Sequence, residues 1–238
     1  MYEKFGQFID GKWQQSTDKG TYEVVNPATE EIIGYASKAT SADVEAALKS
    51  QYVTDILVSS DSDEILDIAC RDDKVSRHKR ESFLATDTST ALELVDHIVT
   101  NSTRRYDFVT LMLPTCPLRT YKHFDQAFDL ISEHDDGIVS VTSYNFPIEL
   151  NVPVKGDYIN LHDSSPLITG NTRSQNHEHR FRPNGGFYVA RWDSFKKNRN
   201  FWKGNVKYFV MSNLDSVDVD TKFDLDIAEL VIKERDDE

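Results

Sequence analysis

The stretch Phe-Val-Thr-Leu-Met-Leu at residues 108–113, followed by Pro-Thr-Cys-Pro-Leu-Arg at residues 114–119, determines the fold that we expect for this sequence. A short, almost wholly apolar run is typical of a strand buried within a parallel sheet. The two prolines cannot continue a regular element, so they predict an irregular loop directly after the strand. Ligands of open α/β sheets bind beyond the carboxyl ends of the strands, so this loop is a candidate site.

Similar apolar runs lie on both sides of this stretch, at residues 55–59 and 138–141. The intervening residues 64–70, 88–99 and 124–131 repeat apolar side chains at helical spacing. Strands that alternate with helices predict an open, mostly parallel, Rossmann-like α/β sheet with right-handed crossovers.

Two segments lack a sustained apolar period. Residues 71–82 are polar and are expected to form a loop, whereas residues 144–180 are expected to form an arm or lid outside the core. After this arm, residues 186–190 and 208–211 predict short strands, and residues 223–232 predict a terminal helix.

Residues 1–47 are expected to form a separate segment rich in β structure. The dipeptide Asp10-Gly11 lies between apolar residues and is typical of a tight hairpin turn. Residues 21–25 and 32–36 predict two further strands, and residues 40–50 predict a short helix that leads into residues 48–238.

The composition excludes several classes of protein. With 27 Lys and Arg against 40 Asp and Glu, the net charge is −13, which disfavours binding to nucleic acid or to an anionic membrane surface. No apolar run approaches the roughly 18 residues of a membrane span, and we see no signal-peptide pattern. The two cysteines have no metal or disulfide spacing, so a reduced, cytoplasmic protein is expected. The ten glycines include no glycine-rich phosphate loop.

Two acidic residues near the C-terminus are candidate metal ligands. Asp218 and Asp220 flank one apolar residue, so in an extended chain their carboxylates point the same way and suit a hard cation such as Mg²⁺. The alternative is that Asp220 or Thr221 caps the last helix and the acids are merely solvated.

A cationic patch at the C-terminal end of the predicted arm is a candidate anion site. Arg173, Arg180 and Arg182, with His177 and His179 between them, form a dense cluster of basic residues in an acidic chain. Arginine suits bidentate capture of a carboxylate or phosphate. A solvated loop that balances nearby acids is the alternative.

Two further features have both a functional and a structural interpretation. Arg80 precedes a helix expected to begin at Asp87 or Thr88, so it marks either an anion or base site or an ordinary helix start with an exposed arginine. Gly185 and Gly186 allow the backbone to approach a ligand closely, or they form only a turn.

Five strings of residues together resemble the acylneuraminate cytidylyltransferases, also called CMP-sialic acid synthetases. The resemblance covers about residues 48–238, and its strings occur in the order and spacing of that family. They are VSSD (58–61), ATDTS (85–89), PTCPLR (114–119), FRPNGGFY (181–188) and SVDVDT (216–221).

The resemblance implies a nucleotidyltransferase that activates a nine-carbon 2-keto sugar acid with CTP, giving a CMP-sugar and pyrophosphate. It implies that Asp218 and Asp220 hold Mg²⁺ and act in catalysis with Arg182. Arg173, Arg182 and Asn184 would receive the sugar acid. The arm at residues 144–180 would form a homodimer. The residues implied to bind the nucleotide are Arg80, Thr86, Asp87, Thr88 and Ser89.

The sequence departs from the family pattern at three positions near the expected site. Leu113 replaces a glutamine, Cys116 replaces a serine, and Glu149 falls where the family has a lysine that would attract the substrate carboxylate. These differences leave the sugar open among sialic, pseudaminic, legionaminic and other 2-keto acids.

A larger departure concerns the N-terminal segment. The family begins with a strand leading into Ala-Arg-x-Gly-Ser-Lys-Gly, which cradles the triphosphate, and this pattern does not occur in these 238 residues. Residues 1–47 resemble instead the N-terminal segment of aldehyde dehydrogenases, which carries neither the cofactor nor the catalytic cysteine. Residues 31–36 are a candidate replacement for the first strand of the sheet.

Three functions therefore remain open from the sequence. The first is a cytidylyltransferase with activity weakened by loss of the loop. The second is a noncatalytic nucleotide-binding or assembly protein that keeps the fold. The third, a fragment of an aldehyde dehydrogenase, predicts NAD binding, for which the sequence offers no residues.

Overall fold

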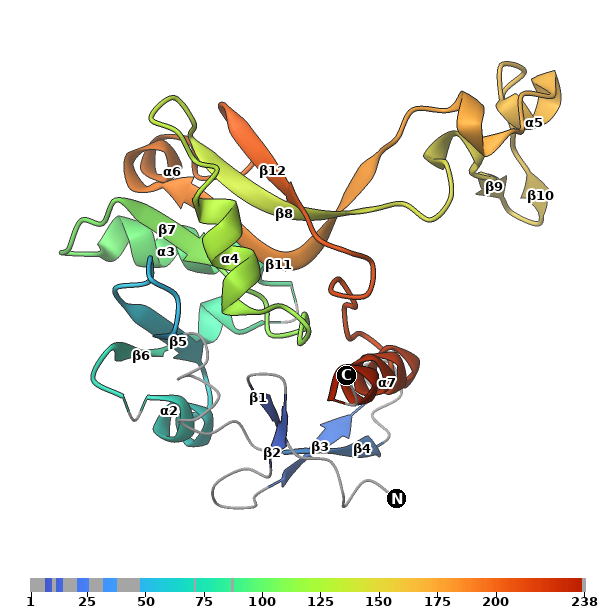
Figure 1. The fold of residues 1–238 in the computed structure, drawn as a ribbon. Coiled ribbons are helices and arrows are strands. Elements are labelled where there is room, and N and C mark those ends of the chain that lie inside the picture. Colours follow the sequence, from blue (N-terminus) through green and yellow to red (C-terminus); the bar gives the residue numbers. More distant parts are fainter. Residues whose placement is uncertain are drawn as a thin grey trace.

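The computed structural model describes residues 48–236, except 71 and 87, and four N-terminal strands (Figure 1). These strands are β1 (Gln7–Ile9), β2 (Lys12–Gln14), β3 (Thr21–Val25) and β4 (Ile32–Ser37). The later strands are β5 (Ile56–Ser60), β6 (Val75–Lys79), β7 (Phe108–Leu111), β8 (Gly137–Ser143), β9 (Val154–Lys155), β10 (Tyr158–Ile159), β11 (Phe181–Arg191) and β12 (Val206–Val210). The helices are α2 (Asp63–Ala69), α3 (Ala91–Asn101), α4 (Tyr121–Phe128), α5 (Pro166–Thr169), α6 (Trp192–Asn198) and α7 (Lys222–Asp236), with 3₁₀ turns η1 (Ser82–Leu84), η2 (Ile148–Leu150) and η3 (Ser174–Asn176).

The main sheet has four strands in the order β12-β8-β11-β7. β12 runs parallel to β8, whereas β11 runs antiparallel to both β8 and β7. The sheet is therefore mixed, while a mostly parallel sheet was expected. The reason is the connection between β8 and β11: a parallel pair requires a crossover over one face of the sheet, but here the intervening arm returns the chain beside β8 in the opposite direction.

β5 and β6 form a separate parallel pair below the main sheet (Figure 1). Among the described strands, none pairs with the second edge of β5 or with the second edge of β7. β5 is consequently less buried than its apolar sequence predicts, and the side chain of Leu57 is 43% exposed.

The N-terminal strands form two antiparallel pairs of their own. β1 and β2 make the predicted hairpin, with Phe8 opposite Trp13. β4 pairs with β3, so the suggestion that residues 31–36 enter the parallel sheet is wrong. The ladder with β3 satisfies the backbone of β4 locally, at a much smaller loop-closure cost than a distant partner would require. The predicted helix at residues 40–50 lies mostly outside the described residues.

The expected loop at residues 71–82 contains a strand, β6, and the turn η1. β6 has the sequence Val-Ser-Arg-His-Lys, of which only Val75 is buried. An edge strand that is largely solvent-exposed needs no alternating apolar residues, so periodicity could not identify it. Its parallel hydrogen bonds to β5 define it instead.

Helices cover both faces of the main sheet. Val95 and Val99 of α3 pack with Phe195 of α6 on the face that includes Ala190. The preceding residue of β11, Val189, points to the opposite face, where α4 packs through side chains of the second core cluster. This second cluster comprises Phe124, Ala127, Ile138, Phe187, Val189 and Met211.

The helix starts differ in detail from those expected. α3 is capped by Thr90, which forms a capping box with Glu93, so the predicted start at Asp87 or Thr88 is wrong. Asp87 itself lies outside the described residues. α6 was not predicted, because its seven residues are too few to show a clear period.

The arm extends away from the main sheet and carries β9, β10 and α5 (Figure 1). Its two ends meet at the sheet, where the Tyr144 N–H donates to the carbonyl of Arg180 at 3.3 Å. Large apolar side chains of the arm face solvent, including Tyr158 at 80% and Ile159 at 65% exposure. In the described part of the chain, no helix has the length and apolar character of a membrane span.

Candidate functional site

A bulge in β11 forms the floor of the candidate site. Pro183 pairs with Val141 and Tyr188 pairs with Val139, so the residues between them project out of the ladder with β8. Gly185 lies in this bulge at φ +73°, a conformation that favours glycine. The two glycines thus form a turn, and this turn lies beside a carboxylate.

That carboxylate belongs to Asp218. A side-chain carbon at Gly185 would lie 3.9 Å from its Oδ2 atom, so the absence of a side chain leaves the carboxylate open toward the turn. Oδ1 of Asp218 is buried and forms no hydrogen bond with any described residue. A buried carboxylate oxygen without a partner is costly, and a bound cation would compensate for it.

The second acid of the predicted pair occupies a different setting. Asp220 is exposed, and its N–H donates at 3.3 Å to Oδ2 of Asp224, which also accepts from the N–H and hydroxyl of Thr221. Thr221 in turn accepts from the Asp224 N–H at 3.4 Å. The helix-start alternative therefore applies to Thr221, and Asp220 is exposed, two residues after Asp218 in the chain.

The described residues suit Mg²⁺ better than a metal ion whose ligands all come from protein side chains. They include no cluster of three or more His, Cys, Asp or Glu side chains arranged to bind a metal. Mg²⁺ commonly binds through one or two carboxylates and completes its shell with water and substrate phosphates. The partnerless oxygen of Asp218 fits this mode, with exposed Asp220 as the second carboxylate.

Arg119 lies in the loop after β7 that the sequence marks as a candidate site, although the sequence assigned this residue no role. Its Nη1 atom donates to the carbonyls of Leu113 at 3.0 Å and Gly186 at 2.7 Å, which ties the loop after β7 to the bulge. Burial lowers the pKa of Arg119 and raises the pKa of the neighbouring Cys116 thiol. The thiol is therefore more firmly protonated than a free cysteine, which argues against a nucleophilic role.

Arg80 lies at the carboxyl end of β6 and bonds to the adjacent strand. Its Nη2 donates to the carbonyl of Ser59 at 2.8 Å, and its Nε lies 3.4 Å from the Ser59 hydroxyl. The same hydroxyl lies 2.9 Å from Nδ1 of His78. Arg80 is thereby fixed at the end of the β5-β6 pair, where ligands of parallel strands are expected.

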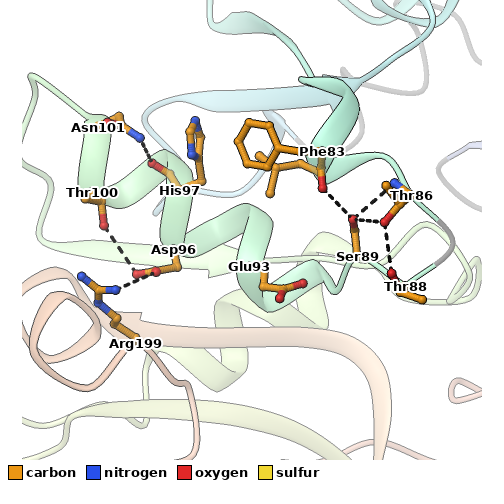
Figure 2. A pocket seen from close by; sticks show the side chains of 11 residues that line it. Phe83, Thr86, Thr88, Ser89, Glu93, Asp96, His97, Thr100, Asn101 and Arg199 are labelled. Carbon is orange, nitrogen blue, oxygen red and sulfur yellow. Dashed lines mark hydrogen bonds and ion pairs between the residues drawn. The ribbon is translucent and has the colours of Figure 1, made fainter.

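The predicted nucleotide turn forms a cluster of hydroxyl groups (Figure 2). Oγ of Ser89 lies 2.7 Å from Oγ1 of Thr86 and donates to the carbonyl of Phe83 at 3.0 Å. Thr88 adds a third hydroxyl, 3.3 Å from that of Thr86. These contacts link the hydroxyls of Thr86, Thr88 and Ser89 just before α3.

The turn borders a cavity of about 440 Å³ between η1 and the outer side of α3 (Figure 2). Two carboxylates line this cavity, those of Glu93 and Asp96. The hydrogen bond from the Thr90 N–H lowers the pKa of Glu93. Asp96 forms an ion pair with Arg199 at 3.4 Å. Arg199 balances the charge of Asp96, which leaves Glu93 as a negative side chain that disfavours phosphate, so this cavity suits an uncharged part of a ligand. The remaining lining residues are Phe83, Leu84, Thr86, Thr88, Ser89, His97, Thr100 and Asn101.

The predicted sugar-binding residues do not form one cluster. Arg182 and Asn184 lie on β11, whereas Arg173 lies in the arm before η3. Asn184 is buried at 1% exposure, with its amide bonded inside the protein, and Arg182 is partly buried. Arg180 forms an ion pair of 2.8 Å with Glu149, which offsets the negative charge introduced at that position.

Comparison with curated proteins confirms the resemblance to cytidylyltransferases. The chain is 27% identical over 187 residues to the N-acylneuraminate cytidylyltransferase of Escherichia coli O18:K1:H7, covering 78% of this chain and 43% of the relative. It is 24% identical over 210 residues to the pseudaminic acid cytidylyltransferase of Campylobacter jejuni strain 81-176, covering 85% and 88%. It is 26% identical over 200 residues to the CMP-N,N'-diacetyllegionaminic acid synthase of Legionella pneumophila, covering 80% and 83%. The chain thus spans less than half the length of the Escherichia coli relative.

Solved structures confirm the α/β fold class. A CMP:2-keto-3-deoxy-manno-octonic acid synthetase complexed with CTP superposes with a TM-score of 0.55 at 11% identity, covering 90% of this chain and 95% of that one. A 4-diphosphocytidyl-2C-methyl-D-erythritol synthase from Anaerococcus prevotii gives the same TM-score at 10% identity, covering 80% and 83%. No protein-family model matches the chain.

The bulge should not tolerate a side chain at its second glycine. In Gly186→Ala, the new carbon would lie 2.9 Å from Oγ of Ser140 and 3.1 Å from Sδ of Met211, so we expect a loss of about 1–3 kcal/mol in unfolding free energy. Urea denaturation measures this loss. Ser140→Ala removes the colliding oxygen, so the double variant should lose less than the sum of the two single losses. Additive losses would contradict a steric origin.

Proposed function

We propose that residues 48–238 form a cytidylyltransferase that joins CTP to a sialic-acid-like 2-keto sugar acid, with triphosphate binding weakened in this chain. The observation that carries the proposal is the partnerless buried oxygen of Asp218 beside the Gly185 turn. Relatives named for this chemistry, at modest identity over most of the chain, support it. Residues 1–47 are a separate segment in this proposal.

The reaction is a nucleotidyl transfer. The anomeric hydroxyl oxygen of the sugar acid forms a bond to the α-phosphorus of CTP, the bond from that phosphorus to the bridging oxygen breaks, and pyrophosphate leaves. The hydroxyl proton passes to solvent. The transferred phosphoryl group carries negative charge throughout, so catalysis rests on placing the two substrates and on balancing that charge.

Asp218 and Asp220 would hold Mg²⁺ in this reaction, and the metal would neutralise phosphate charge on the substrate and leaving group. Asp218 offers an oxygen that has no hydrogen-bond partner in the described protein, and Asp220 is exposed two residues further along the chain. Arg182, next to the bulge on β11, would add a positive charge at the reacting centre.

The cytidine would lie between Arg80 and the turn that carries Thr86, Thr88 and Ser89. Arg80 is fixed by Ser59, and the hydroxyls of the turn are fixed by one another, so both are ordered before a ligand binds. The carboxylate of Glu93 along the cavity behind the turn would disfavour a phosphate there. We place the phosphates at Asp218 and Asp220, because Mg²⁺ held by these residues would balance the phosphate charge.

The sugar acid would be received by Arg182, with Arg173 supplied from the arm. Arginine binds a carboxylate through two parallel hydrogen bonds, which suits the carboxyl group of a 2-keto acid. The ion pair between Arg180 and Glu149 removes the repulsion that Glu149 would otherwise exert on this group.

We expect weak triphosphate binding because the described sheet has no strand in the position from which the family's triphosphate loop would extend. β5 and β7 each leave one edge without a described partner, and β4, the candidate for that position, pairs with β3. The pattern Ala-Arg-x-Gly-Ser-Lys-Gly does not occur in the 238 residues, so we propose that no loop of this kind binds the phosphates.

A panel of sugars tests the activity. The protein, CTP and Mg²⁺ are incubated separately with N-acetylneuraminic, pseudaminic, legionaminic and 2-keto-3-deoxyoctonic acids, and pyrophosphate release is measured. We expect slow release with at least one nine-carbon acid and none without sugar. Because Asp218 supplies the open carboxylate, Asp218→Asn should abolish this release. No release with any sugar would sink the enzyme proposal and favour a noncatalytic binding protein.

Calorimetry with CTP and CMP tests the two halves of the nucleotide site. With EDTA, the two nucleotides should bind within about threefold of each other, since the proposed protein contacts are to cytidine. Mg²⁺ should tighten CTP binding by about tenfold in the wild type and not in Asp218→Asn. Asp226→Asn, an exposed acid on α7, is the control and should retain the effect of Mg²⁺. A protein with no heat for either nucleotide would contradict the site.

The arm supports a homodimer. Tyr158 and Ile159 on β10 expose most of their surfaces, and further apolar residues of the arm do the same, which is typical of a protein interface. We expect a dimer by sedimentation velocity and a monomer for the double variant Tyr158→Lys and Ile159→Lys. Phe223→Lys, at a site 70% exposed on α7, should leave the dimer intact. A monomeric wild type would refute this role of the arm.

A further inference from the structure

Asn184 forms the centre of a hydrogen-bond network inside the protein. Its Oδ1 accepts from the hydroxyl of Ser140 at 2.6 Å and from the N–H of Gly186 at 3.1 Å. Its Nδ2 donates to the hydroxyl of Ser216 at 2.9 Å and lies 3.2 Å from Sδ of Met211. The amide group has two donors and two main acceptor positions, and this network uses all of them.

The bonds of this amide reach both segments that border the proposed metal site. The bond to the Gly186 N–H closes the turn that contains Gly185, and the bond to Ser216 reaches the segment that leads to Asp218. Asn184 is 1% exposed, Ser140 0% and Ser216 1%, so water cannot replace these bonds without opening the core.

Asp218 depends on its neighbours for its orientation. Its Oδ1 has no hydrogen-bond partner in the described protein, so that oxygen is not held by a bond of its own. The chain is instead held on both sides of Asp218. The hydroxyl of Ser216 accepts from Asn184 and donates to the carbonyl of Ser212 at 2.6 Å, and the N–H of Val219 donates to the carbonyl of Thr115 at 2.8 Å. The bonds of Ser216 and Val219 therefore hold the backbone of Asp218 in place, and the backbone determines where its carboxylate lies.

We propose that Asn184 is a positioning residue that aims Asp218 at the Gly185 turn, through Ser216, and is not a contact of the sugar acid. The proposal rests on the proposed function of Asp218 as a metal ligand. It assigns to Asn184 a role that differs from the one implied by the sequence. It also makes Ser216 part of the metal site without any contact with the metal.

Binding of Mn²⁺ alone, measured by the relaxation of water protons, tests this without requiring activity. Mn²⁺ shares the oxygen ligands and octahedral geometry of Mg²⁺. Ser216→Ala removes the group that Asn184 holds, and we expect a loss of about fivefold or more in Mn²⁺ affinity. Thr142→Val is the matched control, because Thr142 is fully buried and bonds at 2.6 Å to Asn213 of the same loop without involving Asn184. It should change the affinity by less than about twofold.

The measurements distinguish a failure of the positioning role of Asn184 from a failure of the metal role of Asp218. Urea denaturation should show that both variants are folded and similarly destabilised, so that a difference in Mn²⁺ affinity reflects positioning. Equal affinity losses in the two variants, or no loss in Ser216→Ala, would overturn the role of Asn184. Asp218→Asn should abolish Mn²⁺ binding. If it does not, the metal role of Asp218 is wrong and the positioning role fails with it.

Discussion

The structure depends on the hydrogen bonding of β8, which pairs along both edges. Every residue from Gly137 to Thr142 is buried, with β11 on one side and β12 on the other. A side-chain carbon at Gly137 would lie 2.1 Å from the carbonyl oxygen of Val189, so only glycine permits this approach of β11. The bulge belongs to β11, and the segment with Asp218 follows β12. Both parts of the candidate site are therefore placed by this one strand.

Elements with a strong apolar pattern were predictable from the sequence. β7 and β8 read as apolar runs because both lie in the main sheet, and α3 and α4 repeat their apolar side chains because each covers one face of it. β6 was missed because an edge strand is defined by its backbone bonds, which a polar sequence does not reveal. The reversal of β11 was missed because strand direction depends on the path of the arm, which has no sustained period.

The candidate site was predictable as a set of residues but not as an arrangement. Spacing identified Asp218 and Gly185, yet the fold alone brings these residues together. Spacing also made Asp218 and Asp220 equivalent, whereas one has a buried oxygen and the other lies on the surface. Arg119 could not be assigned a role, because its partners are two backbone carbonyls that have no signature in the sequence.

The meeting of the two ends of the arm makes it an insertion between neighbouring positions of the sheet. Tyr144 and Arg180 are joined by a backbone hydrogen bond, so 35 residues separate two points that a short turn could connect. Changes in the length or sequence of the arm need not alter the register of β8 and β11. The sheet and the arm can therefore diverge at different rates, and the surface that the arm presents can change while the Gly185 turn and Asp218 keep their positions.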